Sequence, residues 1–225
     1  MEAYRIEQLY DKKETMAADL LEQAVYPWEL LSQISDYIIA LGQTLPRDRF
    51  EQRGESVWIA RSATVFDSAY INGPCIIDEE AEIRQCAFIR GSAIVGKGAV
   101  VGNSTELKNV ILFNQVQVPH YNYVGDSILG YKSHMGAGSI TSNVKSDKSL
   151  ITIHTQQGNL ETGLKKIGAM LGDYVEVGCN SVLNPGTIIG RHSNVYPLSM
   201  VRGYVPENSI FKNQDTIVLK EGNHS

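Results

Sequence analysis

Cysteine is scarce in this sequence, and the three cysteines that occur are far apart. Cys75, Cys86 and Cys179 form no C-x-x-C pair, and their number is odd. Such a set is typical of reduced thiols in a cytoplasmic protein, and it argues against a disulfide framework or a metal held by cysteine. We therefore expect a cytoplasmic protein whose stability comes from apolar packing.

Long apolar runs and blocks of one charge are also missing. No stretch approaches the roughly 20 apolar residues that span a bilayer, and the mixed-charge N-terminus lacks the apolar core of a signal peptide. The 20 Lys and Arg residues nearly balance the 25 Asp and Glu residues, for a net charge of −5. This balance argues against nucleic acid or an anionic membrane as the main partner.

A Gly-rich phosphate loop is absent from the first part of the chain, residues 1–47, which is expected to form a helical appendage. Ile6, Leu9 and Tyr10 share one helical face, and apolar residues return at spacings of three and four from Trp28 to Leu41. The segment is too short for a nucleotide-binding α/β domain. We interpret it as an element for packing or oligomerisation.

A six-residue period begins at Ile59 and dominates the rest of the chain. It comprises 21 units, with one-residue slips after Leu107 and Val124 and a gap after Thr141. Small residues such as Ala81 and Ala87 follow four places after the apolar ones. The apolar positions are Ile59, Val65, Ile71, Ile77, Ile83, Ile89, Val95, Val101, Leu107, Leu112, Val118, Val124, Leu129, Met135, Thr141, Leu171, Val177, Leu183, Ile189, Val195 and Val201.

This period fits neither an amphipathic helix nor an alternating strand, and it predicts an all-β parallel β-helix of hexapeptide repeats. Three units close one triangular coil, so seven coils would extend about 34 Å at the spacing of paired strands. The Gly that often follows the apolar residue, as at Gly96 and Gly102, is expected to supply a permissive turn conformation.

The repeat sets the expected organisation of the chain. The β-helix would occupy residues 48–205, and a polar loop at 143–170 would project from it. Loops of this length in a compact domain are often functional. Residues 206–225 would form a C-terminal extension, with a final strand at Ile217–Leu219 and a frayed tail from residue 221.

Three motifs carry a family resemblance. They are ELKN at 106–109, PHYNYVGD at 119–126 and MGAGSITSN at 135–143. The chain resembles, over about residues 26–205, the acetyltransferase half of bifunctional enzymes that make UDP-N-acetylglucosamine. In those enzymes a glucosamine-1-phosphate acetyltransferase is fused to a uridyltransferase.

The resemblance implies a left-handed coil and a homotrimer with active sites between neighbouring prisms. It also implies acetyl-CoA as the acetyl donor, an amino-sugar 1-phosphate as acceptor, and no metal. Because the uridyltransferase half has no counterpart here, we expect no pyrophosphorylase activity. A separate nucleotidyltransferase chain is a candidate partner.

His120 matches the general base of that family. Acetyl transfer to an amine requires the loss of a proton, and imidazole titrates near neutral pH. A histidine on a repeat surface is usually unremarkable, so the role depends on the flanking match. Asn143 matches an asparagine at the acetyl-transfer site, and Tyr123 matches a tyrosine that binds the sugar.

The resemblance also assigns a phosphate site and a donor site. Arg90 and Lys108 match residues for the sugar phosphate, and their 18-residue spacing equals one coil, so the two cations would stack. His134 stands where bacterial enzymes have asparagine. A loop lysine matches Lys166, with Lys165 as its neighbour. Cys179 and Pro197 match the acetyl-CoA site.

Three other interpretations are weighed beside this one. A γ-type carbonic anhydrase needs two histidines in H-x-x-x-x-H, and no two of the five histidines have that spacing. An acyltransferase acting on another sugar nucleotide remains open. A non-catalytic scaffold or regulatory subunit remains open too, although a scaffold has no use for His120, Lys108, Tyr123 and Asn143 together.

Overall fold

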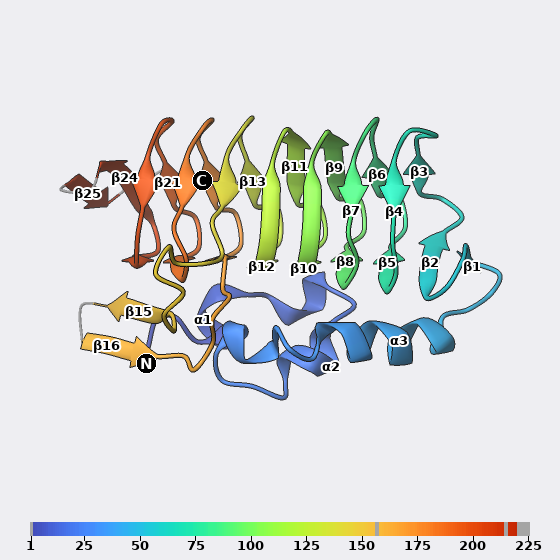
Figure 1. The fold of residues 1–225 in the computed structure, drawn as a ribbon, viewed down its shortest axis with the longest axis horizontal. Coiled ribbons are helices and arrows are strands. Elements are labelled where there is room, and N and C mark those ends of the chain that lie inside the picture. Colours follow the sequence, from blue (N-terminus) through green and yellow to red (C-terminus); the bar gives the residue numbers. More distant parts are fainter. Residues whose placement is uncertain (1, 156–157, 214–215, 220–225) are drawn as a thin grey trace.

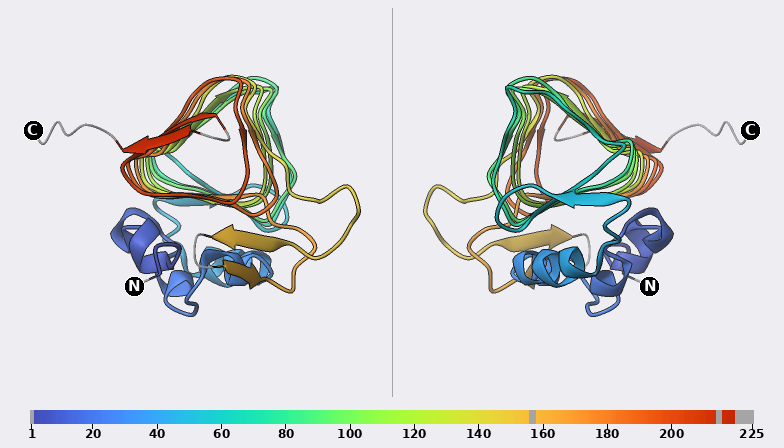
Figure 2. Two further views of the ribbon diagram at one scale, coloured as in Figure 1. Left: turned by 90° about the vertical axis from the view of Figure 1, so that its left-hand side faces the viewer. Right: turned by 90° about the vertical axis from the view of Figure 1, so that its right-hand side faces the viewer.

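Short parallel strands stack into a three-sided prism. The computed structural model describes residues 2–155, 158–213 and 216–219 of the chain. Seen end-on the prism is a triangle, and viewed from its C-terminal end the chain turns clockwise as it advances toward the viewer (Figure 2). That sense defines a left-handed coil. The predicted left-handed parallel β-helix with a short N-terminal helical segment is therefore confirmed.

The prism has three sides, which we call the covered face, the ladder face and the polar face (Figure 1). The covered face consists of β2 (Val57–Ala60), β5 (Cys75–Ile77), β8 (Ala93–Val95), the ends of β10 (Glu106–Leu112) and β12 (Tyr123–Leu129), β17 (Ala169–Leu171), β20 (Thr187–Ile189) and β23 (Tyr204–Val205). The ladder face consists of β4 (Tyr70–Ile71), β7 (Phe88–Ile89), the starts of β10 and β12, β14 (Ile140–Thr141), β19 (Val182–Leu183) and β22 (Met200–Val201). The polar face consists of β3 (Thr64–Val65), β6 (Glu82–Ile83), β9 (Val100–Asn103), β11 (Gln117–His120), β13 (His134–Met135), β18 (Glu176–Val177), β21 (Asn194–Val195) and β24 (Ser209–Asn213).

The apolar residue of each unit points into the prism. Ile77, Val95 and Leu112 are direct partners on neighbouring strands, and all three are fully buried. The small residues four places on, such as Ala81 and Ala87, are buried as well. Burying one aliphatic side chain contributes roughly 1.5–3 kcal/mol, so a column of such residues stabilises the prism without disulfides.

The coil continues beyond the last predicted repeat unit. β23 pairs in parallel with β20, and β24 pairs in parallel with β21, so stacked strands extend to Asn213. Val205 follows Val201 by only four positions, so a fixed six-residue period stops matching there. β25 (Thr216–Leu219) pairs antiparallel with β24, which confirms the predicted final strand. The tail predicted from residue 221 lies outside the described residues.

The glycines that follow the apolar residues have a different role from the one the repeat suggested. Gly96 and Gly102 do not have a positive φ. A Cβ on Gly102 would lie 1.6 Å from the carbonyl oxygen of Pro119 in the next coil. Close approach of stacked coils therefore selects glycine there, and the left-handed corner conformation falls on later residues, many of which are not glycine.

The N-terminal segment packs along the covered face. Its elements are α1 (Ile6–Leu9), η1 (Lys12–Glu14), α2 (Ala18–Leu21), η2 (Pro27–Leu30) and α3 (Ile34–Thr44), and Figures 1 and 2 show them beneath one side of the prism. The covered face presents an outward row of buried apolar side chains: Ile76, Ile94, Ile111, Ile128, Met170 and Ile188. This row repeats once per coil without a charged residue, which explains why the appendage packs there.

A buried carboxylate fixes the start of the appendage to the prism. Asp173 accepts hydrogen bonds from the backbone N–H groups of Asp11 (2.7 Å) and Tyr131 (2.9 Å), and pairs with Arg191 at 2.9 Å. Burial raises the pKa of Asp173, although Arg191 opposes this shift. The Tyr10 hydroxyl donates to the Ile128 carbonyl at 3.3 Å. These bonds align the appendage with the coils.

The predicted loop interrupts the coil between β14 and β17. It contains an antiparallel hairpin of β15 (Thr152–Thr155) and β16 (Gly158–Glu161), which lies beneath the prism beside the appendage. Ile151 and Ile153 are buried, so this part of the loop packs rather than projects. Within the described residues, no helix is long and apolar enough to cross a membrane.

Candidate functional site

A buried carboxylate organises one edge of the prism, where the ladder face meets the covered face. The Asp126 side chain is 5% exposed. It accepts hydrogen bonds from Lys108 Nζ at 3.1 Å, from Asn109 Nδ2 at 2.9 Å and from Asn143 Nδ2. We call this edge the Asp126 corner. Three donors from the two neighbouring coils, Lys108 and Asn109 on one side and Asn143 on the other, converge there on one charge.

The two register slips create this corner. They shorten the ladder side of two successive coils to five residues, so Lys108 pairs with Gly125, 17 positions later. Asn109 (φ 57°) and Asp126 (φ 48°) are the left-handed corner residues, a conformation that Asn and Asp tolerate better than most side chains. A Cβ at Gly125 would lie 2.5 Å from the Tyr123 hydroxyl. Glycine therefore makes room for the tyrosine ring.

Tyr123 closes the corner on the ladder face. Its hydroxyl accepts a hydrogen bond from Asn143 Nδ2 at 3.3 Å. Burial is the largest cause of a raised pKa for Tyr123, and the carboxylates of Asp126 and Glu106 add to it. The phenol therefore keeps its proton at neutral pH, and that proton is available for donation to a ligand.

Arg90 and Lys108 stack on neighbouring coils, as their spacing predicted. Phe88 and Glu106 are strand partners, and the Arg90 N–H donates to the Leu107 carbonyl at 2.9 Å. Each cation already has a carboxylate partner, because Arg90 Nη1 lies 2.8 Å from Glu106 Oε1 and Lys108 bonds to Asp126. The ion pair with Glu106 raises the pKa of Arg90. Half of the Arg90 side chain remains exposed.

His120 lies at the other edge of the ladder face, where that face meets the polar face. The exposed imidazole makes no hydrogen bond or ion pair with the residues that the structure describes, in contrast to its backbone. The His120 N–H donates to Asn122 Oδ1 at 3.1 Å, and the buried Asn122 amide donates to the carbonyls of Gly136 (2.9 Å) and Ser139 (3.0 Å). We call this edge the His120 corner. Its backbone is fixed by hydrogen bonds, and its imidazole has no partner among the described residues.

One chain does not bring the two corners together. Tyr121 (φ 52°) turns the chain at the His120 corner, and Asp126 turns it at the other. Five residues of extended chain separate them, a span of about 16 Å. His120 is thus too far from Lys108 and Asn143 of its own chain to share a small ligand with them.

Cys179 and Pro197 lie along the His120 corner. The Gly138 N–H donates to the His120 carbonyl, the Asn180 N–H to the Ala137 carbonyl, and the Leu198 N–H to the Cys179 carbonyl. These bonds step from coil to coil, so both predicted donor-site residues follow His120 toward the C-terminal end. Both are exposed.

His134 lies apart from the other predicted residues. It is on the polar face, where His134 Nδ1 is 2.8 Å from Glu176 Oε2, beside a cavity of about 380 Å³ that Gln117, Lys132 and Tyr174 also line. Across the described ranges, no three His, Cys, Asp or Glu side chains gather as metal ligands would.

Lys166 returns to the Asp126 corner. The next residue, Ile167, donates its N–H to the Asn143 carbonyl at 3.1 Å, and the Gly168 N–H donates to the Asp126 carbonyl. The two ends of the long loop therefore meet at this corner. Lys166 and Lys165 are both exposed there.

Sequence reasoning missed the acidic half of the site. It assigned no role to Glu106, Asn109 or Asp126, which hold the predicted cations and amide. A signal was present in the sequence. Asn109 and Asp126 each stand two positions after the apolar residue at which the period slips, and Asn and Asp tolerate a left-handed corner better than most residues.

The fold and the two corners define a left-handed β-helix protein of the hexapeptide-repeat class. The chain belongs to the family described as the GMPPB C-terminal domain, which matches residues 71–213.

Curated relatives agree with the resemblance predicted from the motifs. The chain is 30% identical over 166 residues to a bifunctional sugar-1-phosphate nucleotidylyltransferase/acetyltransferase of Sulfurisphaera tokodaii, covering 66% of this chain and 41% of that protein. It is 25% identical over 212 residues to the putative uncharacterized acetyltransferase YaiX of Escherichia coli, covering 92% and 88%. The chain spans about two fifths or less of the bifunctional relatives.

Solved structures include the polySia specific acetyltransferase NeuO. It is 13% identical, with a TM-score of 0.44, and the match covers 76% of this chain and 91% of that one.

Proposed function

We propose that the chain is an acetyltransferase that moves acetyl from acetyl-CoA to the amine of an amino-sugar 1-phosphate of the glucosamine 1-phosphate type. The observation that carries the proposal is the pair of corners on the ladder face. One presents an unpartnered imidazole, and the other presents cations and amides in fixed positions. Acetyl transfer to an anionic amino sugar needs both.

The chemistry assigns one task to each residue. His120 takes a proton from the sugar amine as the amine nitrogen attacks the thioester carbon. The N–C bond forms, the C–S bond breaks, and the proton passes to the departing CoA thiolate. Arg90 and Lys108 bind the phosphate, which replaces part of their bonding to Glu106 and Asp126. Tyr123 and Asn143 orient the sugar and the reacting group.

A homotrimer would bring the two corners together. The ladder face has outward apolar side chains that stay exposed among the described residues, whereas the appendage covers the apolar row on the covered face. Tyr70, Phe88 and Met200 on the ladder face are 62%, 38% and 52% exposed. A second copy packed on this face would place its own His120 corner beside the Asp126 corner of the first.

The donor would lie along the His120 corner. Exposed backbone at Cys179 and Pro197 continues from His120 toward the C-terminal end, so a long, thin molecule such as acetyl-CoA can follow it with the thioester at His120. This agrees with the exposure of both residues and needs no further side chain.

The decisive experiment is a thiol-release assay with acetyl-CoA and a panel of amino-sugar 1-phosphates. We expect CoA release that depends on the amino sugar, and no release of pyrophosphate from UTP and sugar phosphate. A protein that turns over no amino sugar, with or without a phosphate or nucleotide attached, would instead be a scaffold or regulatory subunit.

A further inference from the structure

A cavity of about 620 Å³ lies just beyond Arg90, toward the N-terminal end of the prism. Three neighbouring parts of the chain line it: the β1–β2 connection, the 71–74 corner, and Ile39 of α3. β1 (Phe50–Gln52) is the antiparallel strand beside β2. We call this the Arg53 cavity, after the cation at its far end. None of the roles proposed above uses it.

Arg90 connects this cavity to the Asp126 corner. The same side chain lines the cavity and pairs with Glu106, the strand partner of Tyr123. The Asn72 N–H donates to the Ile89 carbonyl, and the Cys75 N–H to the Ser56 carbonyl, so the cavity covers two further coils. Two rungs correspond to about 10 Å. A ligand held at the Asp126 corner can therefore extend past Arg90 into the cavity.

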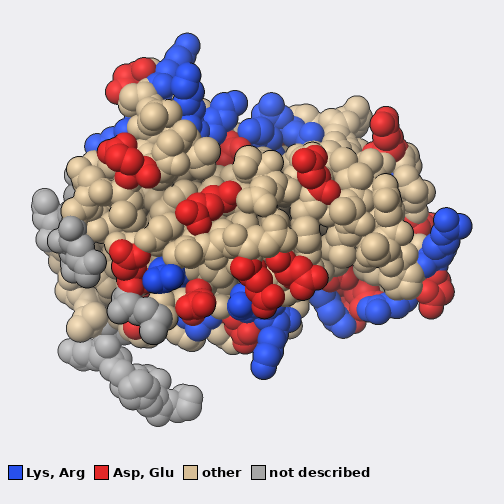
Figure 3. Space-filling model, turned by 90° about the horizontal axis from the view of Figure 1, so that it is seen from below, with Lys and Arg blue, Asp and Glu red and all other residues tan. Residues whose placement is uncertain are grey.

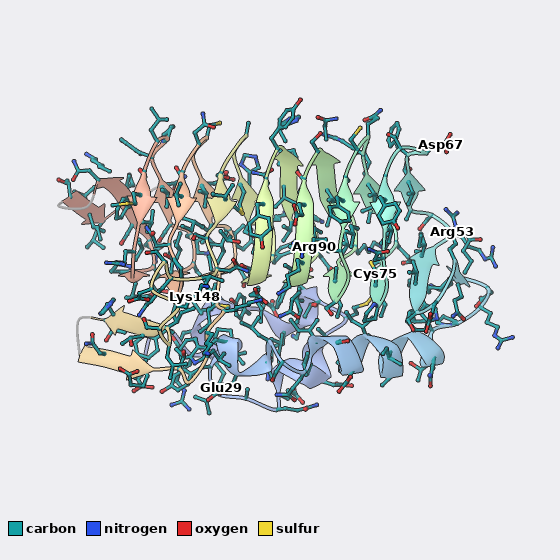
Figure 4. All side chains as sticks on the ribbon, in the orientation of Figure 1. Glu29, Arg53, Asp67, Cys75, Arg90 and Lys148 are labelled. Carbon is teal, nitrogen blue, oxygen red and sulfur yellow. The ribbon has the colours of Figure 1, made fainter. Side chains whose placement is uncertain are left out.

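The cavity has chemically distinct parts. Arg90 stands at one end and Arg53 at the other, and Figure 4 shows both on the sheet side that faces the viewer. Ile39, Ile71 and Pro74 supply an apolar wall. Asn72 and Glu55 supply an exposed amide and an exposed carboxylate.

Close packing of the backbone fixes the shape of the cavity. A Cβ at Gly73 would lie 2.3 Å from the Glu55 carbonyl oxygen, and a Cβ at Gly91 would lie 2.5 Å from the Gly73 carbonyl oxygen. Three successive coils therefore touch through backbone at this edge. The cavity is part of the prism itself rather than a gap between mobile side chains.

The charge beside the Asp126 corner favours an anion. Seen from below, Lys and Arg side chains gather along the left and middle parts of the upper edge of Figure 3, which is the side that faces the viewer in Figure 1. The net charge of the chain is −5, so this gathering is local. A phosphate chain would start in this positive region and reach the cavity at Arg90.

We propose that the Arg53 cavity binds the nucleoside part of a nucleoside-diphosphate-linked amino sugar. This rests on the proposed function and narrows its substrate class. The sugar lies at Tyr123 and Asn143, and the first phosphate at Lys108 and Arg90. The second phosphate lies between Arg90 and Asn72.

The nucleoside then fills the cavity. Its base packs on Ile71 and Pro74, and the planar guanidinium of Arg53 stacks on it. The ribose hydroxyls donate to the Glu55 carboxylate, a pairing that other nucleotide sites use. An amino-sugar monophosphate would end at Arg90 and leave this volume and Arg53 without a role.

Calorimetric titration of the full chain separates the parts of the ligand. The probes are UDP, GDP, dTDP and CDP, with inorganic pyrophosphate and glucosamine 1-phosphate for comparison. We expect at least one nucleoside diphosphate to bind about tenfold more tightly than pyrophosphate, since a stacked base contributes roughly that factor.

Two cavity variants and one control locate the binding. Arg53→Ala is expected to weaken that nucleoside diphosphate about fivefold to tenfold and to leave pyrophosphate unchanged. Asn72→Trp, which fills the cavity from an exposed position beside the second phosphate, is expected to weaken both the nucleoside diphosphate and pyrophosphate. Arg61→Ala is the matched control. Arg53 and Arg61 both pair with Glu51, but Arg61 lies outside the cavity.

The outcomes distinguish this inference from the proposed function. Equal binding of pyrophosphate and all four nucleotides, or an unchanged Arg53→Ala, would overturn the nucleoside site. The proposed acetyl transfer to glucosamine 1-phosphate would then remain, without a nucleoside site. Nucleotide binding that Arg53→Ala removes, without acetyl transfer to any amino sugar, would leave the nucleoside site in place and overturn the enzyme.

Discussion

The two corners of the ladder face differ in how their side chains are satisfied. At the Asp126 corner, one buried carboxylate accepts hydrogen bonds from Lys108, Asn109 and Asn143. At the His120 corner, hydrogen bonds fix the backbone and leave the imidazole without a partner among the described residues. In the proposed reaction, the first arrangement would hold the substrate and the second would supply the base. The comparison therefore assigns binding and proton transfer to different edges of the prism.

The largest expected effect is a loss of activity on substitution at the His120 corner. His120→Ala should lower kcat of acetyl transfer by about 10²–10⁴-fold, the usual contribution of a general base. Because the imidazole is exposed, the free energy of unfolding should change by less than about 0.5 kcal/mol. A thiol-release assay and urea denaturation measure the two quantities.

His154→Ala is the matched control for this substitution. His154 is exposed and lies on the β15–β16 hairpin, where it bonds to Asn159. Its loss should leave kcat unchanged. Equal activity of the His120 variant and wild type would remove His120 from the mechanism.

At the Asp126 corner, we expect substitution to lower the stability of the fold. Asp126→Ala leaves Lys108 and Asn109 without their acceptor and Asn143 with the Tyr123 hydroxyl alone, so the free energy of unfolding should fall by about 3 kcal/mol, as for other broken buried pairs. Urea denaturation measures this change. Asp147→Ala, on the exposed part of the loop, should change it by less than about 0.5 kcal/mol. A stable Asp126 variant would show that this network contributes little to the free energy of unfolding.

Whether the corners combine between copies can be tested by mixing. We expect His120→Ala and Lys108→Ala to be nearly inactive alone. If each site takes one corner from each of two chains, mixed trimers should regain about a third of wild-type activity, since a cyclic trimer of both variants pairs two intact corners at one of its three sites. Co-expression with two affinity tags yields the mixed species. Activity no higher than that of either variant would place both corners in one chain's site.

The repeat made most of this fold predictable, because an inward apolar residue every six positions has no other simple explanation. The same rule failed near Val201, where a four-residue unit continues the coil to Val205. It also missed the outward row from Ile76 to Ile188, which a search at one coil's spacing would have found. At the site, motif matching found Lys108 and Asn143. It missed Asp126, because a carboxylate in a tight corner reveals its partners only once the coils stack.

The smallest expected effect concerns the phenol between the corners. Tyr123→Phe removes the acceptor of one hydrogen bond from Asn143, so the free energy of unfolding at pH 7 should fall by about 0.5–1 kcal/mol. Burial raises the pKa of Tyr123 above its ordinary value of 10.0, so the folded protein keeps this proton where the unfolded chain has lost it. Wild-type stability therefore falls as pH rises above 10, and phenylalanine lacks this loss. The stability deficit of the Tyr123→Phe variant should narrow between pH 7 and pH 11 in urea denaturation.

Tyr121→Phe, at the exposed His120 corner, should match wild type at pH 7. A deficit that widens above pH 10 would mean that Arg90 stabilises the phenolate, and would reverse the contrast drawn between the corners.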